Sequence, residues 1–150
     1  RGLTEGGLDV VTIGMGPSPM LYFATYHLDV DGGIQVTGSH NPADYNGFKM
    51  LLGGRSVFGE EIQALGRRCA AGEWSEGRGK VEEVDVTDAY VDRLVEDFKG
   101  GAFRIGWDAG NGAGGVVLEK LVREKIVERK AARAAEQVVS DEPHSTNPGR

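Results

Sequence analysis

Residues 33–50 read GIQVTGSHNPADYNGFKM, and this stretch decides the fold. Its first six residues, 33–38, form an apolar, β-branched run that predicts a strand. The residues GFKMLLGG, 47–54, predict another strand or one arm of a hairpin. The loop 38–46 therefore lies at the end of a strand. In open α/β sheets, ligands bind at the carboxyl ends of the strands.

A strand and a helix precede this stretch. Residues 8–14, LDVVTIG, predict a buried strand that ends at Gly14. Residues 16–28 predict a helix, for which Ser18 can serve as the cap and Pro19 suits the first turn. The strand–helix–strand order with short connections predicts a parallel βαβ unit. The apolar face of this helix is expected to consist of Met20, Phe23, Ala24 and either His27 or Leu28.

Two amphipathic helices are predicted after the loop. Residues 58–72 predict a helix that ends at Gly72, and residues 87–100 predict a helix that Thr87 can cap. A polar connection, 72–86, with a short extended end joins them. The apolar positions are Ile62, Leu65 and Cys69 in the first helix, and Tyr90, Val91, Leu94, Val95 and Phe98 in the second. Cys69 is thus expected to be a packing residue.

The sequence changes character after residue 100. Residues 103–115, FRIGWDAGNGAGG, predict a strand that leads into a glycine-rich turn. This turn could cradle a phosphate, although we favour a structural role. Residues 119–139 predict one long helix whose apolar stripe must be buried, for example by self-association. We therefore divide the chain into 1–100, a truncated second domain at 101–139, and a disordered polar tail at 140–150.

The composition indicates which partners are not expected and which cellular compartment is favoured. The net charge is −6, and residues 1–100 hold 9 basic and 16 acidic side chains, so nucleic acid is not an expected partner. No apolar run approaches the ~20 residues of a membrane span, and no membrane partner is expected. A single cysteine indicates a reducing compartment, which favours the cytoplasm. The chain begins abruptly, without a signal peptide, and we expect it to be a fragment.

The residue types of the loop are compatible with phosphoryl chemistry and equally with a plain polar turn. A serine hydroxyl such as that of Ser39 is a weak nucleophile unless a base or metal assists it. A phosphoserine there would carry a charge of about −2 and three acceptor oxygens, which require a metal or cationic partners. Asn41 and the loop amides can donate hydrogen bonds, and Lys49 can supply charge or exchange a proton. The alternative is a polar turn that Pro42 closes, with His40 solvated.

The motifs TGSHNP and YNGFK stand in order with GMGPSPMLYFA, TDAYVDRL and WDAGNGAGG. Together they resemble the α-D-phosphohexomutases, specifically the bacterial phosphomannomutase/phosphoglucomutase group, over residues 8–122. The resemblance implies an α/β fold: a three-layer sandwich with a mixed, mostly parallel sheet and an incomplete second domain that ends in a long helix. It further implies that Ser39 carries the phosphoryl group and binds Mg²⁺, with His40 and Lys49 as acid/base and charge-stabilising groups. The residues implied to bind substrate or hold the loop are Thr37, Gly38, Asn41, Asn46 and Gly47.

The implied reaction moves a phosphoryl group between the 1- and 6-positions of a hexose phosphate. Phosphoserine would donate to the sugar, and a hexose 1,6-bisphosphate would reorient and return a phosphate to the serine. The family's Asp-Gly-Asp-Gly-Asp-Arg metal loop is absent, as are its specificity and phosphate-clamping loops. We therefore expect the isolated chain to be inactive. The alternatives are a non-catalytic sugar-phosphate-binding or interaction domain and a decayed gene fragment.

Overall fold

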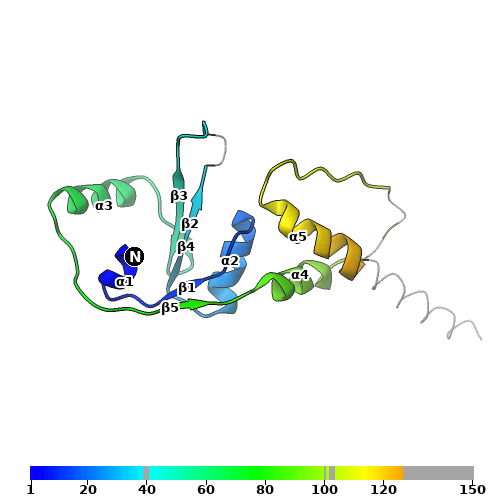
Figure 1. Ribbon diagram of the computed structural model, residues 1–150, viewed down its shortest axis with the longest axis horizontal. Coiled ribbons are helices and arrows are strands. Elements are labelled where there is room, and N and C mark those ends of the chain that lie inside the picture. The colour runs from blue at the N-terminus through cyan, green and yellow to red at the C-terminus, as the bar shows by residue number, and fades with distance from the viewer. Residues whose placement is uncertain (39–40, 100, 102–103, 127–150) are drawn as a thin grey trace, which may run out of the picture. The chain divides into compact units, whose positions relative to one another are not determined.

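The computed structural model describes residues 1–38, 41–99, 101 and 104–126. The chain forms two compact units, Arg1–Tyr90 and Val91–Arg150, and the boundary lies inside helix α4 (Thr87–Glu96). The remaining elements of the first unit are α1 (Gly2–Glu5), β1 (Val10–Thr12), α2 (Ser18–His27), β2 (Gly32–Thr37), β3 (Gly47–Leu52), β4 (Arg55–Ser56), α3 (Glu60–Ala70) and β5 (Val81–Glu83) (Figure 1). The α/β class is confirmed. The predicted division at residue 100 stays a prediction.

The strands form two small sheets. β2, β3 and β4 make an antiparallel sheet in that order, and β1 pairs with β5 in parallel. The predicted parallel pairing of 8–14 with 33–38 is therefore wrong, and only one of the three strand pairings described is parallel. The physical reason is that hydrophobic alternation predicts strands but not their partners. A short loop pairs β2 with its chain neighbour, whereas β1 finds its partner about 70 residues away.

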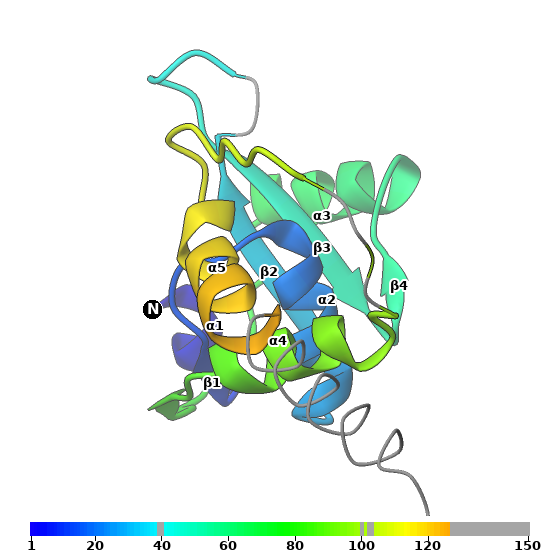
Figure 2. The same ribbon diagram turned by 90° about the vertical axis from the view of Figure 1, so that its right-hand side faces the viewer.

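Helices α2 and α3 lie on opposite sides of the antiparallel sheet (Figures 1 and 2). α2 packs closely on its side, because a Cβ added at Gly33 would lie 2.8 Å from Thr25 Cγ2 and 3.0 Å from Leu21 Cδ1. The buried residues on this side are Met20, Ala24, Thr25 and Leu51. These contacts form the core of the first unit and fix the position of α2 against β2.

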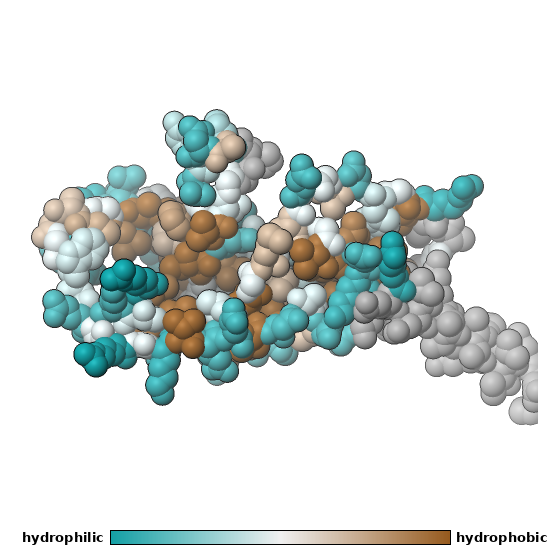
Figure 3. Space-filling view, viewed as in Figure 1, coloured by the Kyte–Doolittle hydropathy of each residue, from teal (hydrophilic) through white to brown (hydrophobic). Residues whose placement is uncertain are grey.

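The other face of the sheet is apolar and exposed. Cross-strand register places Ile34 beside Met50 and Val36 beside Phe48, and Ile34, Val36 and Phe48 are 44–63% exposed. The apolar positions of α3 are exposed as well, so the expectation that Cys69 is a packing residue is wrong. Hydrophobic atoms accordingly gather at the surface over α3 and the β2–β3 hairpin (Figure 3).

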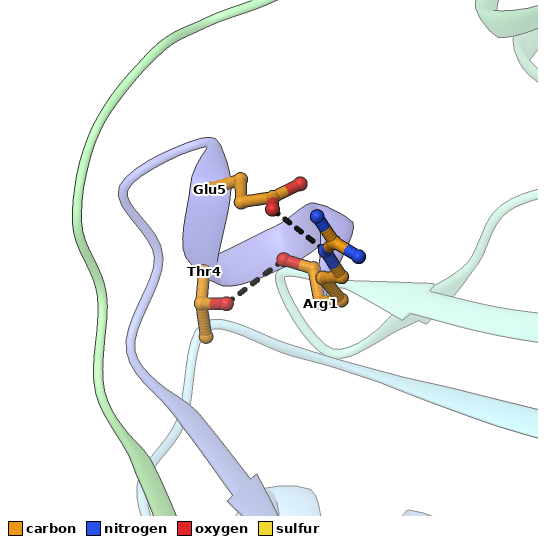
Figure 4. Close-up of polar contacts among 3 residues, drawn as sticks. All are labelled: Arg1, Thr4 and Glu5. Carbon is orange, nitrogen blue, oxygen red and sulfur yellow. Dashed lines mark hydrogen bonds and ion pairs between the residues drawn. The ribbon is translucent and has the colours of Figure 1, made fainter.

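Two glycines allow the connection before β5 to run against the N-terminal segment. Gly77 N donates to Glu5 O at 2.7 Å, and Gly79 N donates to Thr4 O at 2.8 Å. A Cβ at Gly79 would lie only 1.8 Å from Leu8 O. The N-terminal partner in this contact is the short helix α1. It contains an Arg1–Glu5 ion pair of 2.8 Å and a hydrogen bond from Thr4 Oγ1 to Arg1 O (Figure 4). This close backbone approach is what brings β5 beside β1.

Two residues predicted to cap helices, Ser18 and Thr87, do not cap them in the structure. The residue before α2 is Pro17, which has no side-chain cap, and Ser18 is the first helical residue. The amide of Thr87 donates to Asp85 Oδ1 at 2.8 Å, so Asp85 is the residue whose side chain binds the start of α4. Gly72, with φ of 69°, follows the end of α3 as predicted.

The apolar stripe of α4 is largely confirmed, because Tyr90, Val91 and Val95 are buried; Leu94 is exposed. Burial raises the pKa of Tyr90. In the second unit, residues 104–109 form no strand, contrary to prediction, since a strand needs a hydrogen-bonding partner and none is described there. The unit continues with α5 (Gly114–Lys120) and a π-helix, η1 (Leu121–Ile126).

The predicted long helix at 119–139 is only partly described. The chain is helical from Gly114 to Ile126, and residues 127–150 lie outside the described residues. The predicted tail at 140–150 lies outside them too. Among the helices that the structure describes, none has the length and apolar character required to cross a membrane.

Candidate active site

The loop between β2 and β3 begins and ends at a tight strand pair. Thr37 and Gly47 are the last partners of the antiparallel register, at the end of the hairpin away from β4 (Figure 1). A Cβ at Gly47 would lie 2.9 Å from Thr37 O and 3.9 Å from Asn41 Nδ2. Only glycine fits this close approach without moving the backbone. The pair therefore fixes where the loop leaves the sheet.

Backbone hydrogen bonds shape the loop itself. Asn41 N donates to Gly38 O at 2.9 Å, and Tyr45 N donates to Pro42 O at 2.9 Å. Ser39 and His40, the predicted phosphoryl carrier and its neighbour, lie outside the described residues. The bond from Tyr45 to Pro42 joins residues three apart, which is the spacing of a β-turn.

The predicted cation, Lys49, lies on β3 two residues beyond Gly47. Residues two apart in a strand point to the same face, about 7 Å apart along it, so Lys49 shares a face with Gly47. Its side chain is exposed, and its Nζ donates a hydrogen bond to Ser18 Oγ at 3.0 Å. The ammonium is thus tied to the first turn of α2, on the α2 side of the sheet.

Gln35 is the cross-strand partner of Lys49 and is not among the predicted site residues. Its Nε2 donates to Gly16 O at 3.1 Å, while its Oε1 is buried without a hydrogen-bond partner among the described residues. The Gln35 side chain therefore contacts the connection between β1 and α2, and the Lys49 side chain contacts the first residue of α2. The sequence signal for Gln35 is its polar side chain between Ile34 and Val36, inside an otherwise apolar strand.

The predicted site residues fall into two groups. Thr37, Gly38, Asn41 and Gly47 meet at the base of the loop, whereas Lys49 reaches Ser18 instead. Asn46 is exposed within the loop. The roles of all these residues stay predictions. The loop base offers backbone amides and the Asn41 side chain, while the Lys49 ammonium is bound to the first residue of α2.

The described part of the chain does not by itself supply a metal site. Among the described residues, no group of three His, Cys, Asp or Glu side chains lies close enough to hold a metal ion. A divalent cation such as Mg²⁺ prefers several oxygen ligands. One serine oxygen from the loop would therefore need further donors from elsewhere.

A surface hollow of about 380 Å³ lies at the other end of the hairpin. It is lined by residues of α2, the turn before β2 and the β3–β4 turn: Thr25, Tyr26, Asp29, Val30, Asp31, Gly32, Leu51, Gly53 and Gly54. None of the predicted site residues lines this hollow. The candidate site stays the loop that the sequence motif predicts, and this hollow adds no support for it.

Comparison with known proteins gives consistent matches. The family model described as phosphoglucomutase/phosphomannomutase, alpha/beta/alpha domain I, matches residues 1–76. The chain is 44% identical over 126 residues to a phosphoglucomutase of Neisseria gonorrhoeae and 40% identical over 123 residues to a phosphomannomutase/phosphoglucomutase of Pseudomonas putida. These alignments cover 82% and 81% of this chain and 27% of each relative.

A solved structure is similar as well. It is a phosphoglucomutase/phosphomannomutase family protein from Burkholderia thailandensis, with a TM-score of 0.68 and 41% sequence identity. The match covers 80% of this chain and 28% of that one. The chain thus spans somewhat more than a quarter of the length of the proteins it matches. The sequence matches and the structural match therefore point to the same group of proteins.

Proposed function

The chain belongs to the phosphoglucomutase/phosphomannomutase family, and from this we propose that its β2–β3 loop is the phosphoryl-carrying part of a hexose-phosphate mutase. The observation that supports this most is the motif TGSHNP at 37–42 inside the matched range, on a loop whose base is the Thr37–Gly47 pair. The substrates we propose are hexose phosphates and hexose 1,6-bisphosphate.

The proposed step begins with a phosphoryl group on Ser39 Oγ. A hydroxyl oxygen of the sugar phosphate attacks phosphorus, the bond from phosphorus to Ser39 Oγ breaks, and the sugar becomes a bisphosphate. The hydroxyl proton passes to a nearby base, for which His40 is the adjacent candidate, and Ser39 Oγ takes up one proton as its bond to phosphorus breaks. After the bisphosphate reorients, its other phosphate returns to Ser39, and the product is the isomeric monophosphate. Such transfers depend mainly on positioning and charge stabilisation.

The described geometry supports a charge-stabilising role for Lys49. The ammonium is held on the same sheet face as the loop base, and its described partner is a neutral hydroxyl rather than a carboxylate. A lysine that keeps its full positive charge can stabilise a phosphoryl group with a charge of about −2. Asn41, whose amide nitrogen lies near the loop base, is suited to hold the loop in shape.

Mg²⁺ belongs to the proposal as a further source of charge stabilisation, with Ser39 as one ligand. The described residues do not complete such a site, so no step is assigned to the metal.

Because the chain spans about 27% of the length of its relatives, we propose that it loads phosphate on Ser39 but does not complete turnover alone. A cytoplasmic location is proposed from the single cysteine.

The direct test is to incubate the chain with glucose 1,6-bisphosphate and Mg²⁺ and to map phosphate by mass spectrometry. Selective label on Ser39 supports the proposal. A chain that binds hexose phosphate without any label on Ser39 would instead support a non-catalytic sugar-phosphate-binding domain.

A further inference from the structure

Ser18, the first residue of α2, binds the predicted site residue Lys49 although the family motif at 37–42 does not include Ser18. We propose that Ser18 is a positioning residue that holds the Lys49 ammonium beside the serine loop. This inference rests on the phosphoryl transfer proposed above, but its geometry is described independently of Ser39. The observation behind it is the 3.0 Å hydrogen bond from Lys49 Nζ to Ser18 Oγ, between residues 31 positions apart.

A lysine needs such a partner if it is to act at one place. Its ammonium lies at the end of a flexible four-carbon stem, and Lys49 is exposed on β3. Without a fixed acceptor the side chain would sample many rotamers in solvent, because ordering a long side chain costs conformational entropy. The Ser18 hydroxyl accepts one of the three ammonium donors and leaves two free for a ligand.

Ser18 is itself held in place. It stands between Pro17 and Pro19, whose rings restrict the backbone on both sides. Pro17 O accepts a bond from the amide of Met20, a fully buried core residue. The backbone that carries the Ser18 hydroxyl is therefore restrained, whereas the Lys49 ammonium lies at the end of a flexible stem.

The connection before Ser18 is tied to the same pair of strands. Gln35, the cross-strand partner of Lys49, donates from Nε2 to Gly16 O at 3.1 Å. Met20 packs closely against Gly16, because a Cβ added at Gly16 would lie 2.5 Å from Met20 Sδ. The start of α2 is therefore fixed to β2 by Gln35 and to β3 by Lys49. The two bonds therefore fix the position of Ser18 relative to β2 and β3.

A hydroxyl acceptor suits a phosphoryl site better than a carboxylate would. A carboxylate would neutralise the ammonium and would repel an incoming phosphate. A neutral serine oxygen orders the ammonium and leaves its charge uncompensated. Ser18 can thus direct Lys49 without reducing its attraction for a phosphate dianion.

The test compares Ser18→Thr with Ser18→Val, which have the same shape and differ in the hydroxyl. Ser18→Ala is a third variant, and Ser56→Ala, on exposed β4, is the control. Two quantities are measured on the full chain. The first is the rate at which acetic anhydride acetylates Lys49, relative to Lys80. The second is the rate at which glucose 1,6-bisphosphate loads phosphate on Ser39.

If Ser18 positions Lys49, the valine and alanine variants raise relative acetylation of Lys49 about two- to fivefold, since one hydrogen bond is lost. They also slow loading of Ser39 by about tenfold, and the threonine variant restores both rates. In a Lys49→Met background, Ser18→Val has no further effect on loading. Circular dichroism verifies that each variant is folded, and the valine–threonine pair decides the question if alanine unfolds.

Equal acetylation of Lys49 in the threonine and valine variants would overturn the inference. An equal effect of Ser18→Val on loading with and without Lys49 would overturn it too, because a merely structural role predicts that result. If the unsubstituted chain loads no phosphate on Ser39, the proposed function fails. The acetylation comparison still decides whether Ser18 holds Lys49.

Discussion

Thr37 and Gly47 pair across β2 and β3 so closely that a Cβ on Gly47 would lie 2.9 Å from the carbonyl oxygen of Thr37. This pair is the base of the loop that holds the TGSHNP motif. It links the sequence pattern to the fold, since the register that buries Leu51 against α2 also sets the point where the loop leaves the sheet.

Gly47→Ala should destabilise the chain by about 1–3 kcal/mol, because the contact with Thr37 O involves backbone that cannot move freely. The matched control is Gly38→Ala in the same loop, where a Cβ would make an ordinary 3.6 Å contact with Tyr45 O. Urea unfolding measures both. Equal midpoints for the two variants would show that the hairpin is not closed in this register.

Gly79→Ala should cost about 3 kcal/mol or more, because the added Cβ would overlap Leu8 O at 1.8 Å. The strand pair β1–β5 depends on this close approach, so its amides should also lose protection from hydrogen exchange. Gly66→Ala in α3 is the opposite control, since nothing lies within 4 Å of the added Cβ. It should stabilise the chain by about 0.5–1 kcal/mol. Wild-type stability of Gly79→Ala would contradict the parallel pairing.

The Arg55–Glu61 ion pair joins β4 to α3 with two hydrogen bonds of 2.8 and 2.6 Å. The bond from Arg55 lowers the pKa of Glu61 below its ordinary value of 4.5. A carboxyl with a lowered folded-state pKa contributes stability above its unfolded pKa and loses it as the pH falls through the folded value.

Glu61→Gln should therefore lower the urea midpoint slightly at pH 7 and by a smaller amount at pH 3. The effect is small because the pair is exposed. Glu76→Gln, an exposed substitution in the connection before β5, serves as the control at both pH values. A larger difference between wild type and Glu61→Gln at pH 3 than at pH 7 would contradict this sign.

The purified chain should not interconvert glucose 1-phosphate and glucose 6-phosphate at a measurable rate. It spans about 27% of its relatives, and removal of even one transition-state donor typically costs 10²–10³ in rate. A coupled assay for glucose 6-phosphate measures this, with a full-length relative as the positive control. Turnover by the chain alone would show that residues 1–150 complete the site without the rest of such a protein.

Local sequence patterns predicted most elements well. The helices at 16–28, 58–72 and 87–100 and the strands at 33–38 and 47–54 were recognisable, because their side chains repeat at helical or alternating spacing. The pairing of β1 was not predictable, since it depends on Gly77 and Gly79, which the sequence shows only as part of a polar connection. The predicted strand that begins at 103 is not formed over the described residues 104–109, because a strand requires a partner that periodicity cannot supply.

The site was predictable in its residues but not in its contacts. The motif identified Thr37, Gly47 and Lys49, and the strand register places all three on one face of the sheet. The sequence predicts that Ser18 is a helix cap, because a serine before a helical run usually has that role. Its contact with Lys49 spans 31 positions, and no local pattern indicates a side-chain bond of that separation.

Phosphate mapping on Ser39 is the most direct test of the proposal that this loop carries the phosphoryl group. The chain is incubated with glucose 1,6-bisphosphate and Mg²⁺, digested, and analysed by mass spectrometry, with Ser39→Ala as the control. We predict that Ser39 takes up nearly all of the label and that Ser39→Ala takes up almost none. Label distributed evenly over Ser18, Ser39, Ser56 and Ser75, or unchanged total label in Ser39→Ala, would contradict a dedicated carrier.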